Sequence, residues 1–304
     1  MTTVFLHERG RAPETLRILR PVRVLDGGNH HPLLCEMQTD HGPAGLWVVK
    51  PPVVTSIASD RGSFGVLSEL AAAEACTWVG IQTPAVGLTR FPEVFENTWL
   101  DKVTADMTVG ERDEVRHIFE CNRGRLAFCC RFLPEALDLR PVLLTKKRWR
   151  RTSAHDAVAL LVLDGYLRND DRQEENPNAL WWRGRLAAID HGDAFASLHR
   201  SGMRGEDLAM RTVLHSRSFP RHVAARAAEK YGSDTSWNEV IDRLDRVSSV
   251  MVETLAAHWP EELDSDPFSG QRGLRDRLSS FLIHRGRYVR DIAAALRNEL
   301  RGTR

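Results

Sequence analysis

The sequence predicts an α+β fold in which a β-rich N-terminal part precedes a larger helical part. Short apolar runs that end at Pro or Gly fill the first third of the 304 residues, a pattern that is typical of strands. Longer segments with apolar residues at helical spacing fill most of the remainder. The pattern changes near Leu133-Pro134, so we expect one lobe at residues 1–133 and a second at 134–304.

The N-terminal part contains five candidate strands and one helix. The first strand leads into the turn Asp26-Gly27-Gly28-Asn29, and the third ends at Pro51-Pro52, where the prolines offer no N–H to a ladder. Apolar residues then recur at helical spacing until Gly80, a suitable residue to end a helix. The candidate strands are Leu16–Leu25, Pro32–Met37, Leu46–Lys50, Phe91–Trp99 and Leu126–Phe132, and the candidate helix is Gly65–Val79.

The C-terminal part is predicted to be mostly helical. Its first helix, Ala154–Leu167, is apolar nearly all round and therefore belongs in a core. A polar loop and a tight hairpin of two short strands, Ala179–Trp182 and Leu186–Ile189, come next. Four further segments with helical spacing complete the chain: Asp207–Leu214, Pro220–Tyr231, Trp237–His258 and Leu274–Leu300.

Composition and charge exclude several classes of protein. The 42 basic and 41 acidic residues nearly cancel, so the chain lacks the overall positive charge of a nucleic-acid-binding protein. We interpret the basic run Lys146–Arg151 as a solvated loop; contact with nucleic acid, anionic lipid or an acidic substrate is the alternative. Without a run of 18 apolar residues, we expect no membrane span. The charged N-terminus and five irregularly spaced cysteines favour a reducing cytoplasm.

One segment carries polar side chains that suit phosphoryl transfer. The loop Asn169–Asn178 follows the buried helix, and Asp190 ends the second strand of the hairpin. Phosphoryl transfer requires one Asp that accepts the proton of the attacking hydroxyl, while amide and carboxylate oxygens hold Mg²⁺ on the phosphates. Asn, Asp and Pro are also ordinary loop formers, so the loop alone does not indicate phosphoryl transfer, and the prediction depends on its combination with Asp190 downstream.

The N-terminal part contains residues that could bind the phosphates of a nucleotide. Lys50 ends an apolar strand and Glu69 lies in the helix that follows, an arrangement with which kinase-like sites hold nucleotide phosphates. We expect these two side chains to form an ion pair, with Glu74 as the next candidate partner for Lys50. Gly27-Gly28 could lie in a loop that covers the phosphates, although the segment lacks a GxGxxG pattern, and a plain hairpin turn is the alternative.

These segments together resemble a known family. The residues that carry the resemblance span about residues 20–195 and are Trp47–Lys50, Ser68–Ala71, Gly80–Pro84, Phe132–Pro134, Asn169–Arg172, Asn176–Asn178 and Ile189–Gly192. They resemble the HipA-like kinase family, a branch of the protein-kinase-like fold that is related to phosphatidylinositol 3- and 4-kinases. The resemblance implies two lobes with nucleotide in the cleft between them.

The resemblance also implies a role for each matching residue. Lys50 would grip the phosphates with Glu69 as its partner, Asp171 would be the catalytic aspartate, and Asp190 would be a Mg²⁺ ligand. Asn176 has the usual spacing for the second ligand, and Asn178, directly before the strand, is the substitute. The backbone of Arg131, Phe132 and Leu133 would meet adenine. We expect Asp171 and Asp190 to converge, and the pKa of at least one to be raised.

The expected activity is ATP- and Mg²⁺-dependent phosphorylation of a hydroxyl. The resemblance implies a protein Ser or Thr acceptor, although no segment identifies the protein partner. The chain departs from conventional protein kinases because it has no His-Arg-Asp, Asp-Phe-Gly or Ala-Pro-Glu sequence. A lipid or small-molecule kinase therefore stays open, as does a non-catalytic nucleotide-binding or interaction module with a kinase-like shape.

Overall fold

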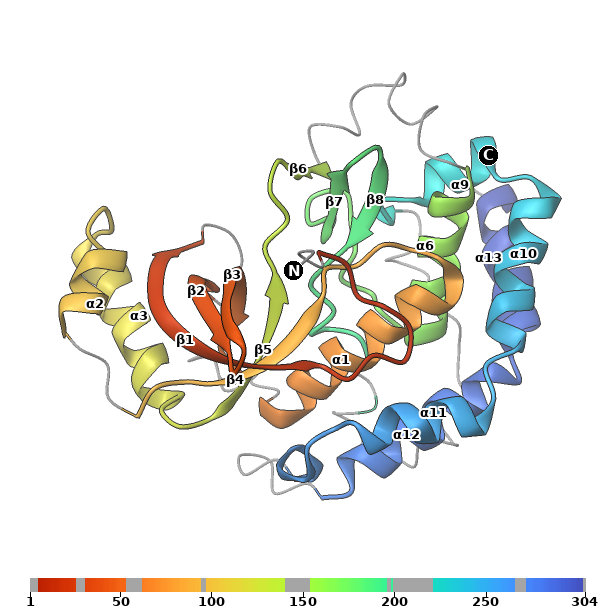
Figure 1. Ribbon diagram of the computed structural model, residues 1–304. Coiled ribbons are helices and arrows are strands. Elements are labelled where there is room, and N and C mark those ends of the chain that lie inside the picture. The colour runs from red at the N-terminus through yellow and green to blue at the C-terminus, as the bar shows by residue number, and fades with distance from the viewer. Residues whose placement is uncertain are drawn as a thin grey trace.

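The chain folds into a β-barrel flanked by two helices and a larger helical part, as Figure 1 shows. The computed structural model describes residues 5–25, 31–52, 62–93, 97–139, 154–195, 198, 221–265 and 272–302. The α+β class and the order of a β-rich part before a helical part are thus confirmed. The β-rich part is a closed barrel, which the sequence did not predict.

Five strands form the barrel in the spatial order β1-β2-β3-β5-β4. Neighbouring strands are antiparallel except β1 and β4, which pair in parallel and close the barrel. Met37, Trp47 and Cys129 are among the buried side chains that fill it. The strands are β1 (Glu14–Val24), β2 (Leu33–Thr39), β3 (Gly42–Lys50), β4 (Val86–Arg90) and β5 (Leu126–Arg131).

The prediction of a strand at Phe91–Trp99 is wrong. The fourth strand is Val86–Arg90, and helix α2 (Asn97–Val103) follows it. The first four residues of β4 are all buried, so the strand shows no alternation that would reveal it in the sequence. Helix α3 (Val109–Cys121), which we did not predict, begins with a capping box between Thr108 and Glu111.

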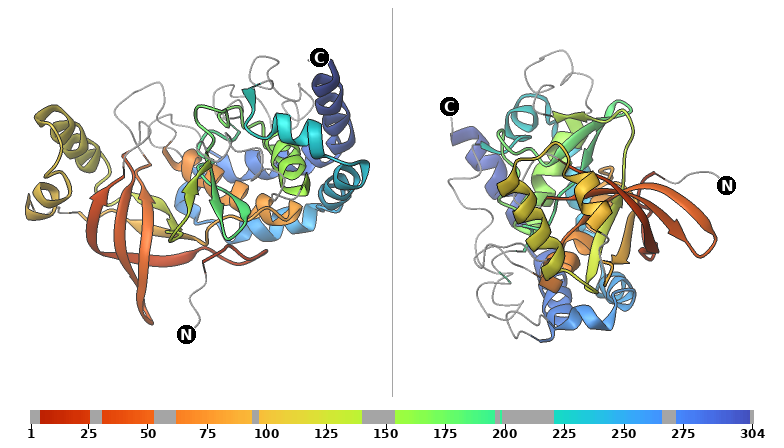
Figure 2. Two further views of the ribbon diagram at one scale, coloured as in Figure 1. Left: turned by 90° about the horizontal axis from the view of Figure 1, so that it is seen from above. Right: turned by 90° about the vertical axis from the view of Figure 1, so that its left-hand side faces the viewer.

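Helix α1 (Gly62–Val79) lies between the barrel and the helical part, as two further views in Figure 2 show. It is buried on every side, including the polar residues Ser68, Glu69 and Glu74. Its apolar residues share the largest core cluster with helix α6 (Ala154–Leu167). One continuous core therefore contains residues from both sides of the lobe boundary that was predicted at Leu133.

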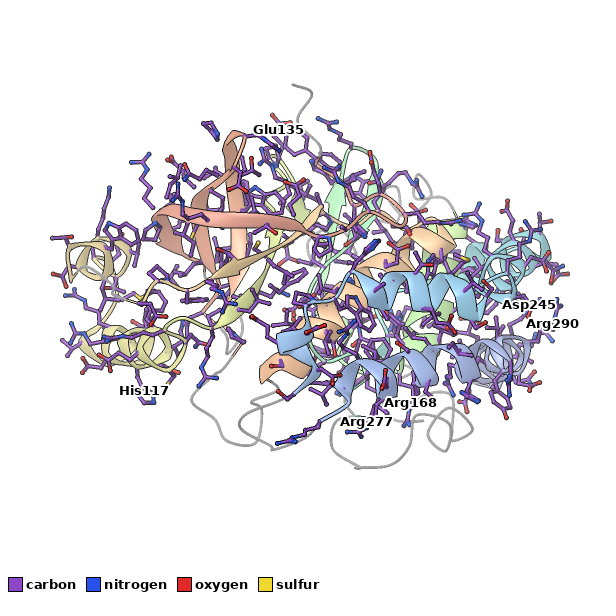
Figure 3. All side chains as sticks on the ribbon, turned by 60° about the horizontal axis from the view of Figure 1, so that its bottom comes forward. His117, Glu135, Arg168, Asp245, Arg277 and Arg290 are labelled. Atoms are coloured by element: carbon purple, nitrogen blue, oxygen red, sulfur yellow. The ribbon has the colours of Figure 1, made fainter. Side chains whose placement is uncertain are left out.

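The remaining helices pack against α6 or against the helices that neighbour it. Two of the expected helices are each split in two, because the chain leaves helical hydrogen bonding at Arg246–Ser248 and again at Arg287-Tyr288. Arg290 donates a hydrogen bond to Asp245 at 2.5 Å and ties two of the resulting helices together (Figure 3). These helices are α9 (Ala225–Tyr231), α10 (Asp234–Asp245), α11 (Ser249–Ala257), the short 3₁₀ helix η2 (Glu261–Asp264), α12 (Leu274–Gly286) and α13 (Val289–Gly302). The expected helix at Asp207–Leu214 lies outside the described residues.

A small three-stranded sheet brings the hairpin against α1. It consists of β6 (Leu137–Asp138), β7 (Ala179–Trp182) and β8 (Arg185–Ala188), of which β7 has the predicted bounds. The Ala188 N–H donates to the Gln82 carbonyl at 2.8 Å, just beyond the end of α1. This contact directs the residues that follow β8, including Asp190, toward α1.

The cysteines are all free, as expected. Cys129 lies in the barrel core, whereas Cys130 packs against the helical core, so these adjacent residues face opposite sides of β5. Within the described part of the chain, no helix has the length and apolar character needed to cross a membrane.

Candidate active site

Lys50, at the end of β3, joins two carboxylates that come from distant parts of the chain. Its Nζ lies 2.5 Å from Glu69 Oε1 on α1 and 2.9 Å from Asp190 Oδ1, which follows β8. The other carboxylate oxygen of Glu69 accepts the backbone N–H of His191 at 2.9 Å. The predicted ion pair between Lys50 and Glu69 is thus confirmed, and Asp190 belongs to the same cluster.

The Lys50 ammonium is held in its charged form. Burial by itself lowers the pKa of Lys50, but the Asp190 and Glu69 carboxylates raise it more, and the net shift is upward. The ring of Phe128 on β5 lies 5.8 Å from Nζ. Glu74, the alternative partner, is engaged elsewhere: it accepts hydrogen bonds from His7, from the Gly10 N–H and from Trp78.

Asp171 lies in the loop after α6 and is held by both candidate asparagines. Its Oδ2 accepts from Asn176 Nδ2 at 3.0 Å and from Asn178 Nδ2 at 2.9 Å. Asn178 is buried, whereas Asn176 is exposed. Each amide donates through its nitrogen, which leaves its oxygen directed away from Asp171. Both asparagines therefore lie beside the carboxylate, and this contact alone does not choose between them as metal ligand.

The pKa of Asp171 is raised. Burial is the largest cause and the nearby Asp190 carboxylate is the second, while hydrogen bonds from Asn178 and Asn176 oppose them. The prediction that the pKa of at least one of these two aspartates is raised is thus confirmed for Asp171, with burial contributing more to the shift than Asp190 does. A cation placed between the two groups would relieve the repulsion between them.

Arg172 connects the two carboxylate-bearing segments beneath the site. Its guanidinium donates to the carbonyl of Asn178 and, at 3.3 Å, to the carbonyl of Ile189. A third hydrogen bond of 3.1 Å reaches Nδ1 of His191. Burial and the charge of Arg172 lower the pKa of His191 to about 3, so this imidazole is neutral and accepts the hydrogen bond.

The Arg172 charge is balanced by Asp164, near the end of α6. Asp164 Oδ2 lies 2.7 Å from Arg172 Nε and 2.9 Å from His222 Nε2, while Oδ1 accepts from Asn169 Nδ2 at 3.1 Å. Burial raises the pKa of Asp164, but Arg172 and His222 lower it more, and the net shift is downward. The carboxylate is therefore ionised deep in the core.

The segment expected to meet adenine runs from the barrel to the small sheet. The Arg131 N–H donates to the Ala85 carbonyl at 2.8 Å and the Phe132 N–H donates to the Leu46 carbonyl at 3.1 Å. Leu133 packs with Trp182 in a small apolar cluster. The N–H groups of Arg131 and Phe132 are thus used within the fold, so a base that docks here would need other hydrogen-bonding groups of this segment.

Two of the sequence-based assignments lie outside the described residues, namely Gly27-Gly28 and the basic run at Lys146–Arg151. In the described part of the chain, no cluster of three or more His, Cys, Asp or Glu side chains could hold a metal ion. Any ion at Asp190 would therefore need amide oxygens, water or phosphate as its other ligands.

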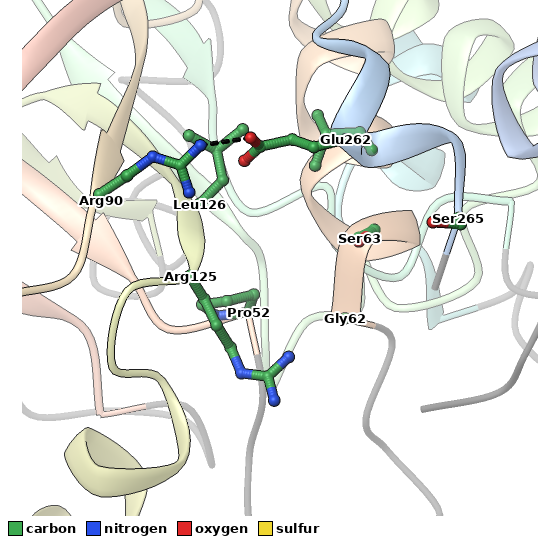
Figure 4. Close-up of a pocket in the computed structure, with 9 residues that line it drawn as sticks. Pro52, Gly62, Ser63, Arg90, Arg125, Leu126, Glu262 and Ser265 are labelled. Carbon is green, nitrogen blue, oxygen red and sulfur yellow. Dashed lines mark hydrogen bonds and ion pairs between the residues drawn. The ribbon is translucent and has the colours of Figure 1, made fainter. Parts of the chain in front are cut away.

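A pocket of about 290 Å³ lies at the N-terminus of α1, and Lys50, Asp171 and Asp190 are not among the residues that line it (Figure 4). Arg90 of β4 pairs with Glu262 of η2 across it, and Arg125 lines its wall. None of the sequence-predicted site residues is among the side chains that line this pocket.

The buried network beneath the site was not predicted from the sequence. A signal for it exists: Asp164 interrupts a helix that is otherwise apolar nearly all round, and a buried carboxylate requires a partner. The identity of that partner follows only from the fold, which brings Arg172 and His222 to it.

Comparison of the chain with protein-family models, with curated proteins and with solved structures found no match.

Proposed function

We propose that this protein is an ATP- and Mg²⁺-dependent phosphotransferase of HipA-like type that phosphorylates a hydroxyl group. The observation that carries the proposal is the Lys50 cluster, in which a strand lysine, a helix glutamate and the aspartate after a distant hairpin are within hydrogen-bond distance. Kinase active sites need a lysine paired with a glutamate of the next helix, together with a metal-binding aspartate.

The roles of the chain's own residues follow from their contacts. An ammonium group has three N–H donors, and Lys50 uses two of them on Glu69 and Asp190, so the third remains for a phosphate oxygen. Asp171 is positioned by the amides of Asn176 and Asn178 and accepts the proton of the acceptor hydroxyl. The hydroxyl oxygen bonds to the γ-phosphorus as the bond from phosphorus to the ADP oxygen breaks.

The donor set near Asp190 fits Mg²⁺. A carboxylate and an amide oxygen are hard ligands, and protein sites usually hold this ion through one or two carboxylates together with water and substrate phosphates. Asp190 is the first ligand that we propose, with Asn178 or Asn176 as the second. When bound, the ion would neutralise charge on the phosphates. The side chain of Asp190 is 46% exposed, so it remains open to an incoming nucleotide.

A Ser or Thr side chain of a protein is the acceptor that we propose, because that is the activity the HipA-like resemblance implies. The free cysteines fit a reducing compartment, and we propose that the enzyme works in the cytoplasm. The following experiment separates this proposal from two alternatives. One is a lipid or a small molecule as acceptor, and the other is a module that binds nucleotide without transferring phosphate.

The test combines phosphate transfer with nucleotide binding in two variants. Asp171→Ala should reduce turnover by about 10²–10⁴-fold, the usual contribution of a positioned acid or base, with little change in ATP affinity. Asp190→Ala should weaken Mg²⁺-dependent nucleotide binding as well as turnover. Labelled ATP with protein, lipid and sugar acceptors measures transfer, and calorimetry measures binding. Nucleotide binding without transfer to any acceptor by the unmodified protein would support the non-catalytic module instead.

A further inference from the structure

Arg172 is a buried cation whose two terminal guanidinium nitrogens contact the segments that carry the candidate active site. The residue is only 1% exposed, and its side chain is fully enclosed. A buried arginine is costly, and apolar replacements of buried ion pairs are often no less stable. Its presence therefore needs an explanation beyond stability.

The pattern of its contacts supplies one. One guanidinium donates to the carbonyl of Asn178, to the carbonyl of Ile189 directly before Asp190, and to the ring of His191 directly after it. It thus contacts the main chain at Asn178 and directly before Asp190, and the side chain of the residue directly after Asp190. A rigid planar fork with five donors can hold several acceptors at set positions, which a lysine cannot do.

The backbone at the bridged positions is unusual. Asn178 has a φ of 43° and Asp190 a φ of 54°, both in the left-handed region that non-glycine residues seldom adopt. Such conformations persist where the surrounding structure imposes them. The guanidinium binds the carbonyl of Asn178 itself and the carbonyl that precedes Asp190, so it is suited to hold both turns.

We infer that Arg172 is a positioning residue, which sets the separation between the Asn178–Asp171 contact and Asp190 through the main chain and His191. This inference rests on the proposed phosphotransferase activity. Arg172 contacts no reacting group; its charge also lowers the pKa of Asp171, but as the smallest of the causes of that shift, and its main effect is on the geometry of its neighbours. Asp164 fixes the guanidinium from the opposite side through Nε, so the two charges form one unit.

The test separates positioning from stability. The double variant Asp164→Leu/Arg172→Met removes both buried charges together, so it leaves no unpaired ion in the core. We expect it to stay folded, with an unfolding temperature lowered because His222 and Asn169 lose their acceptor, while kcat falls about 10²-fold, the scale of a 1 Å misplacement. The Mg²⁺ concentration that gives half-maximal activity should rise about tenfold. Recovery of normal kcat in a stable double variant would overturn the inference.

A matched control is available on α12. Arg285 is also buried and also donates to main-chain carbonyls, but these are the carbonyls of Gly165 and Tyr166 in α6 and not those of the loop and hairpin that carry Asn178 and Asp190. Arg285→Met should lower the unfolding temperature without changing kcat or the Mg²⁺ requirement of the folded enzyme. If Arg285→Met and the Arg172 variants lower activity equally, Arg172 has no special role.

A second pair of variants applies even if the Arg172 variants do not fold. In His191→Asn the amide oxygen takes the place of Nδ1 and can still accept from Arg172, whereas in His191→Gln the amide lies nearer the place of Nε2. We expect His191→Asn to retain most activity and His191→Gln to lose about tenfold. Equal activity of the two variants would refute positioning through His191. An unmodified protein that neither binds MgATP nor transfers phosphate would instead refute the proposed function.

Discussion

Asp164→Asn tests the buried network through a change of one atom. Both oxygens of Asp164 face only donors: Arg172 Nε, His222 Nε2 and Asn169 Nδ2. The amide nitrogen of the new asparagine would have to face one of them, and Arg172 would keep a buried charge without a carboxylate. Breaking a buried ion pair from one side costs about 3–5 kcal/mol. We therefore expect a loss of about 4 kcal/mol in the free energy of unfolding at pH 7.

Asp156→Asn is the control on the same helix. Asp156 is equally buried and pairs with Arg185 at 2.6 Å, but the Arg185 side chain is 43% exposed. Water can solvate that guanidinium once its partner is gone, so we expect a smaller loss of about 1–2 kcal/mol. Urea unfolding of both variants under identical conditions measures the difference. Equal losses in the two variants would refute the argument that the enclosed Arg172 charge determines the cost.

The pH dependence of the same variant gives an independent check. The fold lowers the pKa of Asp164, so its stabilising contribution is present above the unfolded value of about 3.9 and is lost as the pH falls through the folded value. The stability difference between the unmodified protein and Asp164→Asn should therefore be full at pH 7 and shrink below about pH 4. A difference that grows on acidification would contradict this assignment of the charge.

Two further predictions concern the candidate site. In a transfer assay, Asn178→Ala should raise the Mg²⁺ concentration required for activity about tenfold or more, and Asn176→Ala should change it less than threefold. The reason is that only Asn178 is anchored by Arg172. A larger effect of Asn176→Ala would instead assign the metal ligand to Asn176. Asp190→Asn should lower the pKa of Asp171, because the substitution removes a carboxylate that helps to raise this pKa. NMR titration of the carboxyl groups without metal measures the shift, and an unchanged pKa of Asp171 would contradict the prediction.

The sequence predicts much of the framework of the site. Lys50 could be placed at the end of a strand because Pro51-Pro52 must stop the ladder, and β7 could be bounded by its apolar run and the turn after it. Glu69 lies in a segment with clear helical spacing, so its position one helix after the lysine was also predictable. These features depend on local patterns, and the structure retains them.

Other features depend on contacts between distant segments. The closure of β1 on β4 joins residues that no local pattern relates, and four consecutive buried residues in β4 conceal that strand. The direct contact of Asp190 with Lys50 spans 140 residues and follows from the packing of the hairpin beside α1. The choice of Arg172 as the partner of Asp164 likewise requires the folded loop.

Calorimetric titration of ATP into the purified protein, with and without Mg²⁺, tests the central claim most directly. We expect nucleotide to bind in a 1:1 ratio and Mg²⁺ to strengthen binding. Asp190→Ala should remove the effect of Mg²⁺, whereas Glu74→Gln, outside the Lys50 cluster, should retain it. Absence of ATP binding in the presence and absence of Mg²⁺ would refute the proposed nucleotide site, and a Mg²⁺ effect that survives the loss of Asp190 would refute its role as metal ligand.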